Sequence, residues 1–210
     1  MILDNRICIQ RYNHKMPQKK TPPLVELDEL LAAEYGYIAQ TANQANEDRA
    51  RVSSFYLIAV GSLVAALFGT QLFDTDKFTQ AVKIMFSGLF ILLTLLGTST
   101  IMQLARLRGA WYESMLAMNQ LKDFAMNQNP ELKNAFRWKT GTLPPKYKTG
   151  SVSYWQAVEV ALIGGLMFAA ATFFLQQAFL PIGLFNWIVS AIAGLLIIYL
   201  QLSIYKRALK

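Results

Sequence analysis

The stretch from Glu34 to Gly69 constrains the fold most, because a polar helical pattern passes into a charge-free apolar one within it. No proline interrupts this stretch. Apolar or small residues recur at alternating steps of four and three, as one face of an α-helix requires, and only Arg49 breaks the series. The series is Leu31, Tyr35, Ile38, Ala42, Ala45, Val52, Tyr56 and Ala59. The pattern predicts one long helix, half in water and half in lipid.

Three blocks without charged residues predict four membrane spans. Residues 52–73 and 84–105 are 22 residues each, and residues 160–205 are 46. The third block is about twice the ~20 residues that one span needs, and Pro181 and Gly183 interrupt its middle. The alternative, a soluble all-α protein with buried helices, requires a polar face that these blocks lack. We therefore predict an all-α polytopic membrane protein with spans at 52–73, 84–105, 158–180 and 184–205.

These spans divide the chain into four regions. Residues 1–23 lack an apolar core of signal-peptide length and are expected to form a flexible cytosolic tail. Residues 24–128 are expected to form a long helical hairpin that extends into the cytosol as an antiparallel stalk and ends at the proline of NQNP. Residues 129–153 mix basic and aromatic side chains and predict a basic amphipathic helix on the inner leaflet, with an ordinary loop as the alternative. Residues 154–210 predict a second transmembrane hairpin, with Ser151 or Ser153 capping its first helix.

The distribution of Lys and Arg predicts the orientation. Residues 1–51 carry seven of them, residues 106–153 carry eight, and the tail after Tyr205 carries three. The loop between the first two spans has only Lys77, and the loop between the last two has none. Because positive charge stays on the cytosolic side, both termini and the central segment are expected in the cytosol, with the protein in the plasma membrane. The net charge of +7 then favours anionic headgroups, and no nucleic-acid partner is expected.

Small residues at intervals of four predict where spans approach one another closely. The triplets are Gly61, Ala65 and Gly69 in the first span, Ala161, Gly165 and Ala169 in the third, and Asn186, Ser190 and Gly194 in the fourth.

Five charged residues near the predicted cytosolic membrane edge are candidate functional or structural polar sites: Glu159, Glu47, Asp48, Arg106 and Arg108. Glu47 is placed to pair with Arg51 one helical turn later, and the predicted stalk brings Asp48 beside Arg106. The charged run 47–51 has two interpretations, a solvated interface anchor or a charge network with a role.

Glu159 is the only acid within a predicted span. We expect it to face the helix bundle and meet a hydrogen-bond donor, or to be protonated by desolvation. One interpretation is a structural lock, in which the carboxylate reaches headgroup water or pairs with Arg106 or Arg108. The other is a gate that lines a polar vestibule between spans.

Motifs of known catalytic chemistry are missing from the sequence. It contains no HExxH, no GxSxG and no glycine-rich phosphate loop, and its only His and Cys, His14 and Cys8, lie in the tail. We therefore expect neither an enzyme nor a cofactor or metal site.

In arrangement, residues Glu34 to Phe124 resemble the small SLATT-type membrane effectors of bacterial defence and nucleotide-signalling systems. The resemblance rests on a juxtamembrane helix that enters a short-looped hairpin, and the second hairpin departs from that two-span pattern, so no residue role carries over. We expect a non-enzymatic membrane effector or scaffold whose stalk binds a cytosolic partner or oligomerises. The alternative is a small channel or transporter subunit, disfavoured by the scarcity of charge inside the spans.

Overall fold

A computed structural model describes residues 27–69 and 79–210, and its regular structure is entirely helical within these ranges. The long helices are α1 (Leu27–Gly69), α2 (Gln80–Gln128), α3 (Val152–Phe179) and α4 (Leu184–Ala208), with short 3-10 helices η2 (Pro130–Asn134) and η3 (Thr140–Thr142). The predicted all-α class is confirmed. The predicted tail, residues 1–23, and residues 70–78 of the first turn lie outside the described residues.

All four long helices contain an 18-residue window with the length and composition needed to cross a membrane. Large apolar side chains on their outer surfaces are exposed, as lipid contact requires; examples are Leu92, Leu95, Leu166, Leu195 and Leu200. By this criterion, the described part of the chain contains four candidate membrane-spanning helices.

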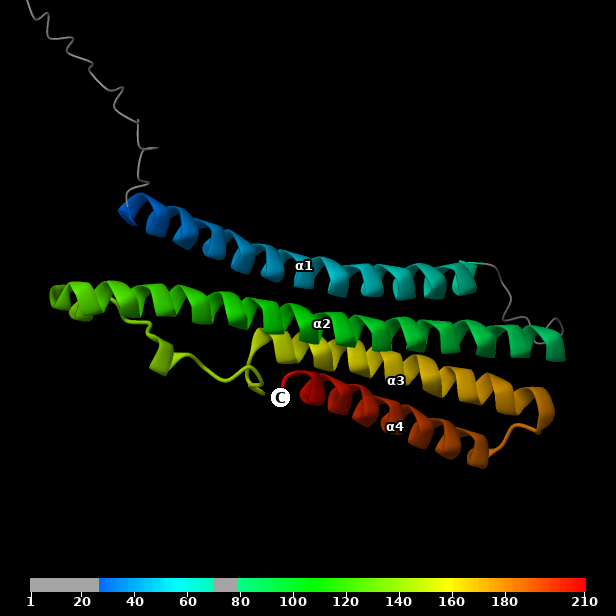
Figure 1. Cartoon of the computed structure of the whole chain (residues 1–210). Helices are drawn as coiled ribbons and strands as arrows, with labels where there is room; N and C mark the ends of the chain where they lie inside the picture. Colours follow the sequence, from blue (N-terminus) through cyan, green and yellow to red (C-terminus); the bar gives the residue numbers. More distant parts are fainter. Residues whose placement is uncertain (1–26, 70–78) are drawn as a thin grey trace, which may run out of the picture.

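Helix α2 is the centre of the arrangement. It lies between α1 on one side and α3 and α4 on the other, and it contacts all three (Figure 1). The first half of α1 and the second half of α2 run antiparallel beyond the ends of α3 and α4. We call this part, residues 27–51 of α1 and 106–128 of α2, the helical extension. At 1.5 Å per residue it is ~35 Å long.

Helices α3 and α4 approach closely because their contact consists of small residues. A Cβ atom built on Gly165 would lie only 2.7 Å from the carbonyl oxygen of Gly194, and Ala161 beside it is fully buried. The small residues Gly61, Ala65 and Gly69 of α1 behave differently. A Cβ atom built on Gly61 or Gly69 would meet nothing within 4 Å. Two of the three predicted packing faces therefore lie at contacts within this chain, and the one on α1 does not.

The ends of the helices follow local rules of capping and proline geometry. Helix α2 stops at Gln128, two residues before Pro130, whose ring cannot continue the helical hydrogen bonds. The Ser151 hydroxyl caps α3 by accepting a 3.2 Å hydrogen bond from the backbone N–H of Tyr154.

The connector between α2 and α3 differs from the basic amphipathic helix that its composition predicts. It contains only the 3-10 helices η2 and η3, and both of them contact α2. The side chain of Asn119 donates a 3.3 Å hydrogen bond to the carbonyl oxygen of Lys139. Pro144 and Pro145 lack the N–H groups that a helix needs, and the nearby carbonyls of Lys139 and Lys146 accept hydrogen bonds from α2 side chains.

Candidate functional site

Arg108 lies at the point where the helical extension meets the four-helix bundle. Only 6% of its surface is exposed. Its Nε donates a 3.2 Å hydrogen bond to the carbonyl oxygen of Lys146 in the connector, and its guanidinium lies 4.3 Å from the ring centre of Trp111. Arg108 therefore holds the connector against α2, with the indole face stabilising its positive charge.

A second guanidinium, that of Arg49 on α1, lies near the first. It donates a 3.1 Å hydrogen bond to Asn46, while its buried Nε has no hydrogen-bond partner. Burial lowers the pKa of both arginines from the ordinary value, Tyr205 opposes this shift, and the charge of Arg49 lowers the pKa of Arg108 further. Neither forms an ion pair with a carboxylate of the described ranges. Two like charges thus interact electrostatically where the extension begins.

The other two helices complete this cluster. The hydroxyl groups of Ser153 on α3 and Tyr205 on α4 share a 2.8 Å hydrogen bond, and both residues are only 1% exposed. We call Arg49, Arg108, Ser153 and Tyr205 the polar junction. Because all four helices contribute to it, a movement of the extension relative to the bundle would disturb these contacts.

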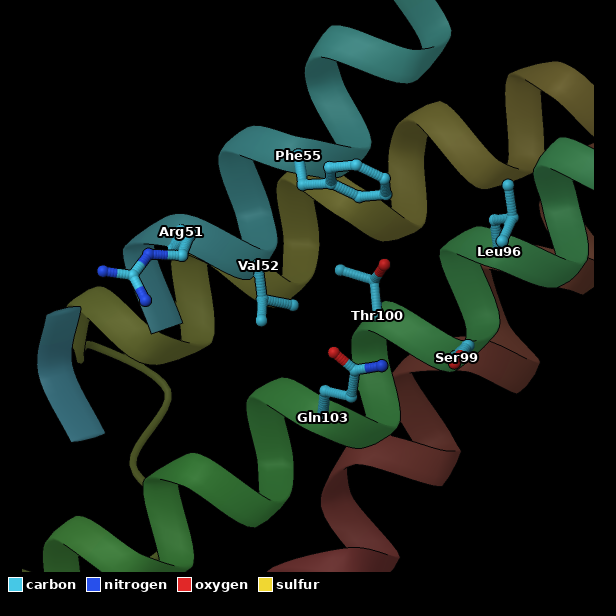
Figure 2. Close-up of a pocket in the computed structure, with 7 residues that line it drawn as sticks. All are labelled: Arg51, Val52, Phe55, Leu96, Ser99, Thr100 and Gln103. Carbon is cyan, nitrogen blue, oxygen red and sulfur yellow. The ribbon is translucent and has the colours of Figure 1, made fainter. Parts of the chain in front are cut away.

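On another side of α1 and α2, a groove runs along the seam between the two helices (Figure 2). One section, of about 350 Å³, is lined by Asp48, Arg51, Val52, Gln103, Arg106 and Leu107. The next, of about 300 Å³, shares some of these residues and is lined by Arg51, Val52, Phe55, Leu96, Ser99, Thr100 and Gln103. We call the two sections together the edge groove, since they lie where the extension enters the apolar part of both helices.

The edge groove brings Asp48 and Arg106 to one surface, but they do not form an ion pair. Asp48 instead accepts a 3.3 Å hydrogen bond from Arg51, three residues along the same helix. The predicted pairing of Glu47 with Arg51 is therefore wrong, because the shorter Asp48 side chain takes that partner. Glu47 is exposed and lines an adjacent polar hollow of about 430 Å³ on α1.

The expectation that Glu159 faces the helix bundle is also wrong. Glu159 is exposed on α3, and its carboxylate forms no ion pair or hydrogen bond within the described ranges. The buried face of α3 contains Ala157, Val160 and Ala161, and Glu159 lies about 200° around the helix from Ala157. It shares its outer surface with Trp155, which is 62% exposed.

Inside the bundle, neutral polar side chains bond to one another between helices. The Gln201 amide donates a 3.0 Å hydrogen bond to the Thr98 hydroxyl, and the Thr94 hydroxyl donates to the carbonyl oxygen of Gly164 at 3.3 Å. Gln176 donates to Ser190 at 3.2 Å. These contacts join α2, α3 and α4 to one another.

Sequence analysis singled out Arg108 as a candidate polar site, but it did not bring Arg49, Ser153 and Tyr205 together with it, and it missed these interhelical contacts. One signal for the junction is present, since Arg49 occupies an apolar position in the periodic series of α1. For Gln201 the signal is weaker, because a single amide in an apolar block does not show which helix it contacts.

A further cavity, of about 340 Å³, lies between the extension and the connector. It is lined by Trp111, Met115, Met118, Asn119, Lys122, Trp138, Leu143 and Pro144. Among the residues that the structure describes, no group of three or more His, Cys, Asp or Glu side chains is close enough to hold a metal ion.

No protein-family model matches this chain, and neither a curated protein nor a solved structure is significantly similar to it. The resemblance to SLATT-type effectors thus remains one of helix arrangement alone.

Proposed function

We propose that this protein is a non-enzymatic membrane effector or scaffold whose helical extension is a cytosolic surface for a partner or a second copy. In this proposal the chain forms two transmembrane hairpins in the plasma membrane, with both termini in the cytosol. The four spans act as an anchor or as a pore-forming effector. The orientation rests on the Lys and Arg counts given above.

The observation that carries the proposal is the exposure of large apolar side chains on the helical extension. Leu30 is 55% exposed, Tyr37 is 67% exposed and Phe124 is 42% exposed. Exposed leucines in the spans face lipid, but these residues lie on the part of α1 and α2 that extends beyond the bundle. Aromatic and apolar groups that face water mark contact sites for other proteins.

The cavity beside the connector supports the same function. Trp111 and Trp138 line it together with Met115, so it offers an apolar pocket with an aromatic wall. Lys122 at the same cavity supplies a positive charge. Such a pocket suits an aromatic or aliphatic anchor residue of a bound protein.

A photoreactive amino acid placed at Tyr37 in the full-length protein tests this proposal in cells. We expect a covalent adduct with a second copy or with a cytosolic protein, detected by gel shift and mass spectrometry. The matched control is the same amino acid at Gln44, an exposed polar residue two turns further along α1. If Tyr37 produces no more adduct than Gln44, the exposed apolar side chains around Tyr37 are not the binding surface.

A small channel or transporter subunit is the alternative, and the polar side chains inside the bundle favour it. Gln176, Thr94 and Gln201 lie among α2, α3 and α4. Their hydrogen bonds join helix to helix, which also explains them as packing contacts. Steady solute flux through proteoliposomes without any added trigger would favour the transporter. Toxicity or depolarisation only after a trigger would favour the effector.

A further inference from the structure

The chemistry of the edge groove changes in a fixed order along the helix axes. On α2, charged Arg106 is followed by polar Gln103 and Thr100 and then by apolar Leu96, a distance of ~15 Å at 1.5 Å per residue. On α1 the lining passes directly from charged Arg51 to apolar Val52 and Phe55. The charged end lies where the extension begins, and the apolar end lies among the spans.

The charged end of the groove has an excess of one positive charge. Asp48 pairs with Arg51 at 3.3 Å, while Arg106 is exposed and has no ion-pair partner within the described ranges. Two guanidinium groups and one carboxylate therefore line this end. A singly negative phosphodiester would balance that charge, and guanidinium groups bind phosphate oxygens through several parallel hydrogen bonds.

The middle of the groove contains hydrogen-bond donors without partners. Ser99, Thr100 and Gln103 line it, and in the described part of the chain none of their side chains makes a hydrogen bond. Thr94 and Thr98 on the same helix instead donate to carbonyl oxygens within α2. In Figure 2 the side chains of Thr100 and Gln103 point toward α1, into the groove. Free donors at this depth suit the ester oxygens of a lipid.

We propose that the edge groove binds one anionic phospholipid of the adjacent leaflet, with its phosphate at Arg51 and Arg106. Its ester groups accept hydrogen bonds from Ser99, Thr100 or Gln103, and an acyl chain lies against Phe55 and Leu96. This inference rests on the membrane placement proposed above, but not on the partner surface of the extension. A phospholipid presents a charged, a polar and an apolar part in the same order as the groove.

Native mass spectrometry of the full-length protein released from detergent tests the proposal. Phosphatidylglycerol and phosphatidylcholine with identical acyl chains are the probes, added separately in a titration. We expect one phosphatidylglycerol to remain bound at concentrations where phosphatidylcholine does not. Arg106→Gln should weaken phosphatidylglycerol binding about fivefold, the effect of ~1 kcal/mol for one basic residue at a lipid headgroup.

Two further variants test the middle of the groove, which both lipids would occupy. Ser99→Trp fills the groove and should reduce the binding of both lipids, and Thr100→Val, which keeps the side-chain shape, should reduce both to a smaller extent. The control is Arg207→Gln, which removes an exposed charge from the C-terminal end of α4, outside the groove. It should leave phosphatidylglycerol binding unchanged.

Three results would overturn the proposal. The first is equal retention of the two lipids by the wild-type protein, and the second is equal loss in Arg106→Gln and Arg207→Gln. The third is a wild-type dimer that becomes a monomer in Ser99→Trp while the number of bound lipids per chain stays the same. That result would mean that a second copy of the chain fills the groove. The cross-linking at Tyr37 described above reports on the extension separately, so the failure of one proposal does not imply failure of the other.

Discussion

The Nε atom of Arg108 donates a 3.2 Å hydrogen bond to the carbonyl oxygen of Lys146, which joins residues 38 positions apart in the sequence. This bond holds an irregular connector on a regular helix. The charge of Arg108 also interacts with that of Arg49 on α1, at the base of the helical extension. The connector, the extension and the bundle are thus coupled at one residue.

Arg108→Gln should loosen the connector, because the shorter amide cannot reach Lys146 and stack on Trp111 together. We expect a loss of about 1–3 kcal/mol in stability, the range for breaking a buried charged hydrogen bond. Trypsin should cut faster after Lys146 and Lys148 in a timed digest. Arg106→Gln is the control, since it removes an exposed arginine from the same helix. Equal cleavage rates in the two variants would show that Arg108 does not hold the connector.

Gly165→Ala should separate α3 from α4, because the new methyl group would lie 2.7 Å from the backbone oxygen of Gly194. Overpacking of this kind costs about 1–3 kcal/mol. A lower midpoint of thermal unfolding in detergent is the expected result. Gly61→Ala on α1 should leave the midpoint unchanged or raise it, since its Cβ would meet nothing within 4 Å. The helix contact is not as described if both variants unfold at the wild-type temperature.

Glu159→Leu should not destabilise the folded chain, because the carboxylate is exposed and has no ion-pair partner in the described ranges. Placing an apolar side chain beside Trp155 should leave the unfolding midpoint unchanged or raise it. Glu159→Gln should behave in the same way. A clear loss of stability in the Leu variant alone would restore the structural lock that the sequence suggested.

Cysteines at positions 48 and 106 should form a cross-link in a Cys8→Ser background, since both positions line one section of the edge groove. The double-cysteine protein is treated with a short bifunctional reagent and then cut by a protease. The fraction of cross-linked fragments on a denaturing gel measures how close the two positions are. Cysteines at 48 and 138 form the control pair, because Trp138 lies at the cavity beside the connector. Preferential cross-linking of the control pair would mean that the helices pair differently.

Reporter fusions test the proposed topology. Fusions at Lys210 and at Gly141 should report a cytosolic location, and a fusion at Thr75 an extracytosolic one, as the distribution of Lys and Arg requires. Alkaline phosphatase and green fluorescent protein activities at each site provide opposite readouts. An extracytosolic signal at Gly141 or Lys210 would exclude the model of four spans with both termini inside.

The sequence alone determined the helices and most of their ends. Charge-free blocks marked four helices that can span a membrane, Pro130 marked the end of α2, and a serine cap marked the start of α3. These features are local, because helix periodicity, proline geometry and capping depend on residues within one or two turns. Small residues at intervals of four also marked the contact between α3 and α4.

Only the tertiary structure decided which helix faces meet. Glu159 turned outward, Arg49 and Arg108 came together, and the connector packed on α2 as irregular chain. Lipid is as apolar as a protein interior, so hydropathy does not distinguish the buried face of a span from its outer face. The rotation of each helix is set by the fit of side chains from distant parts of the chain, which the hydropathy of a single span does not specify.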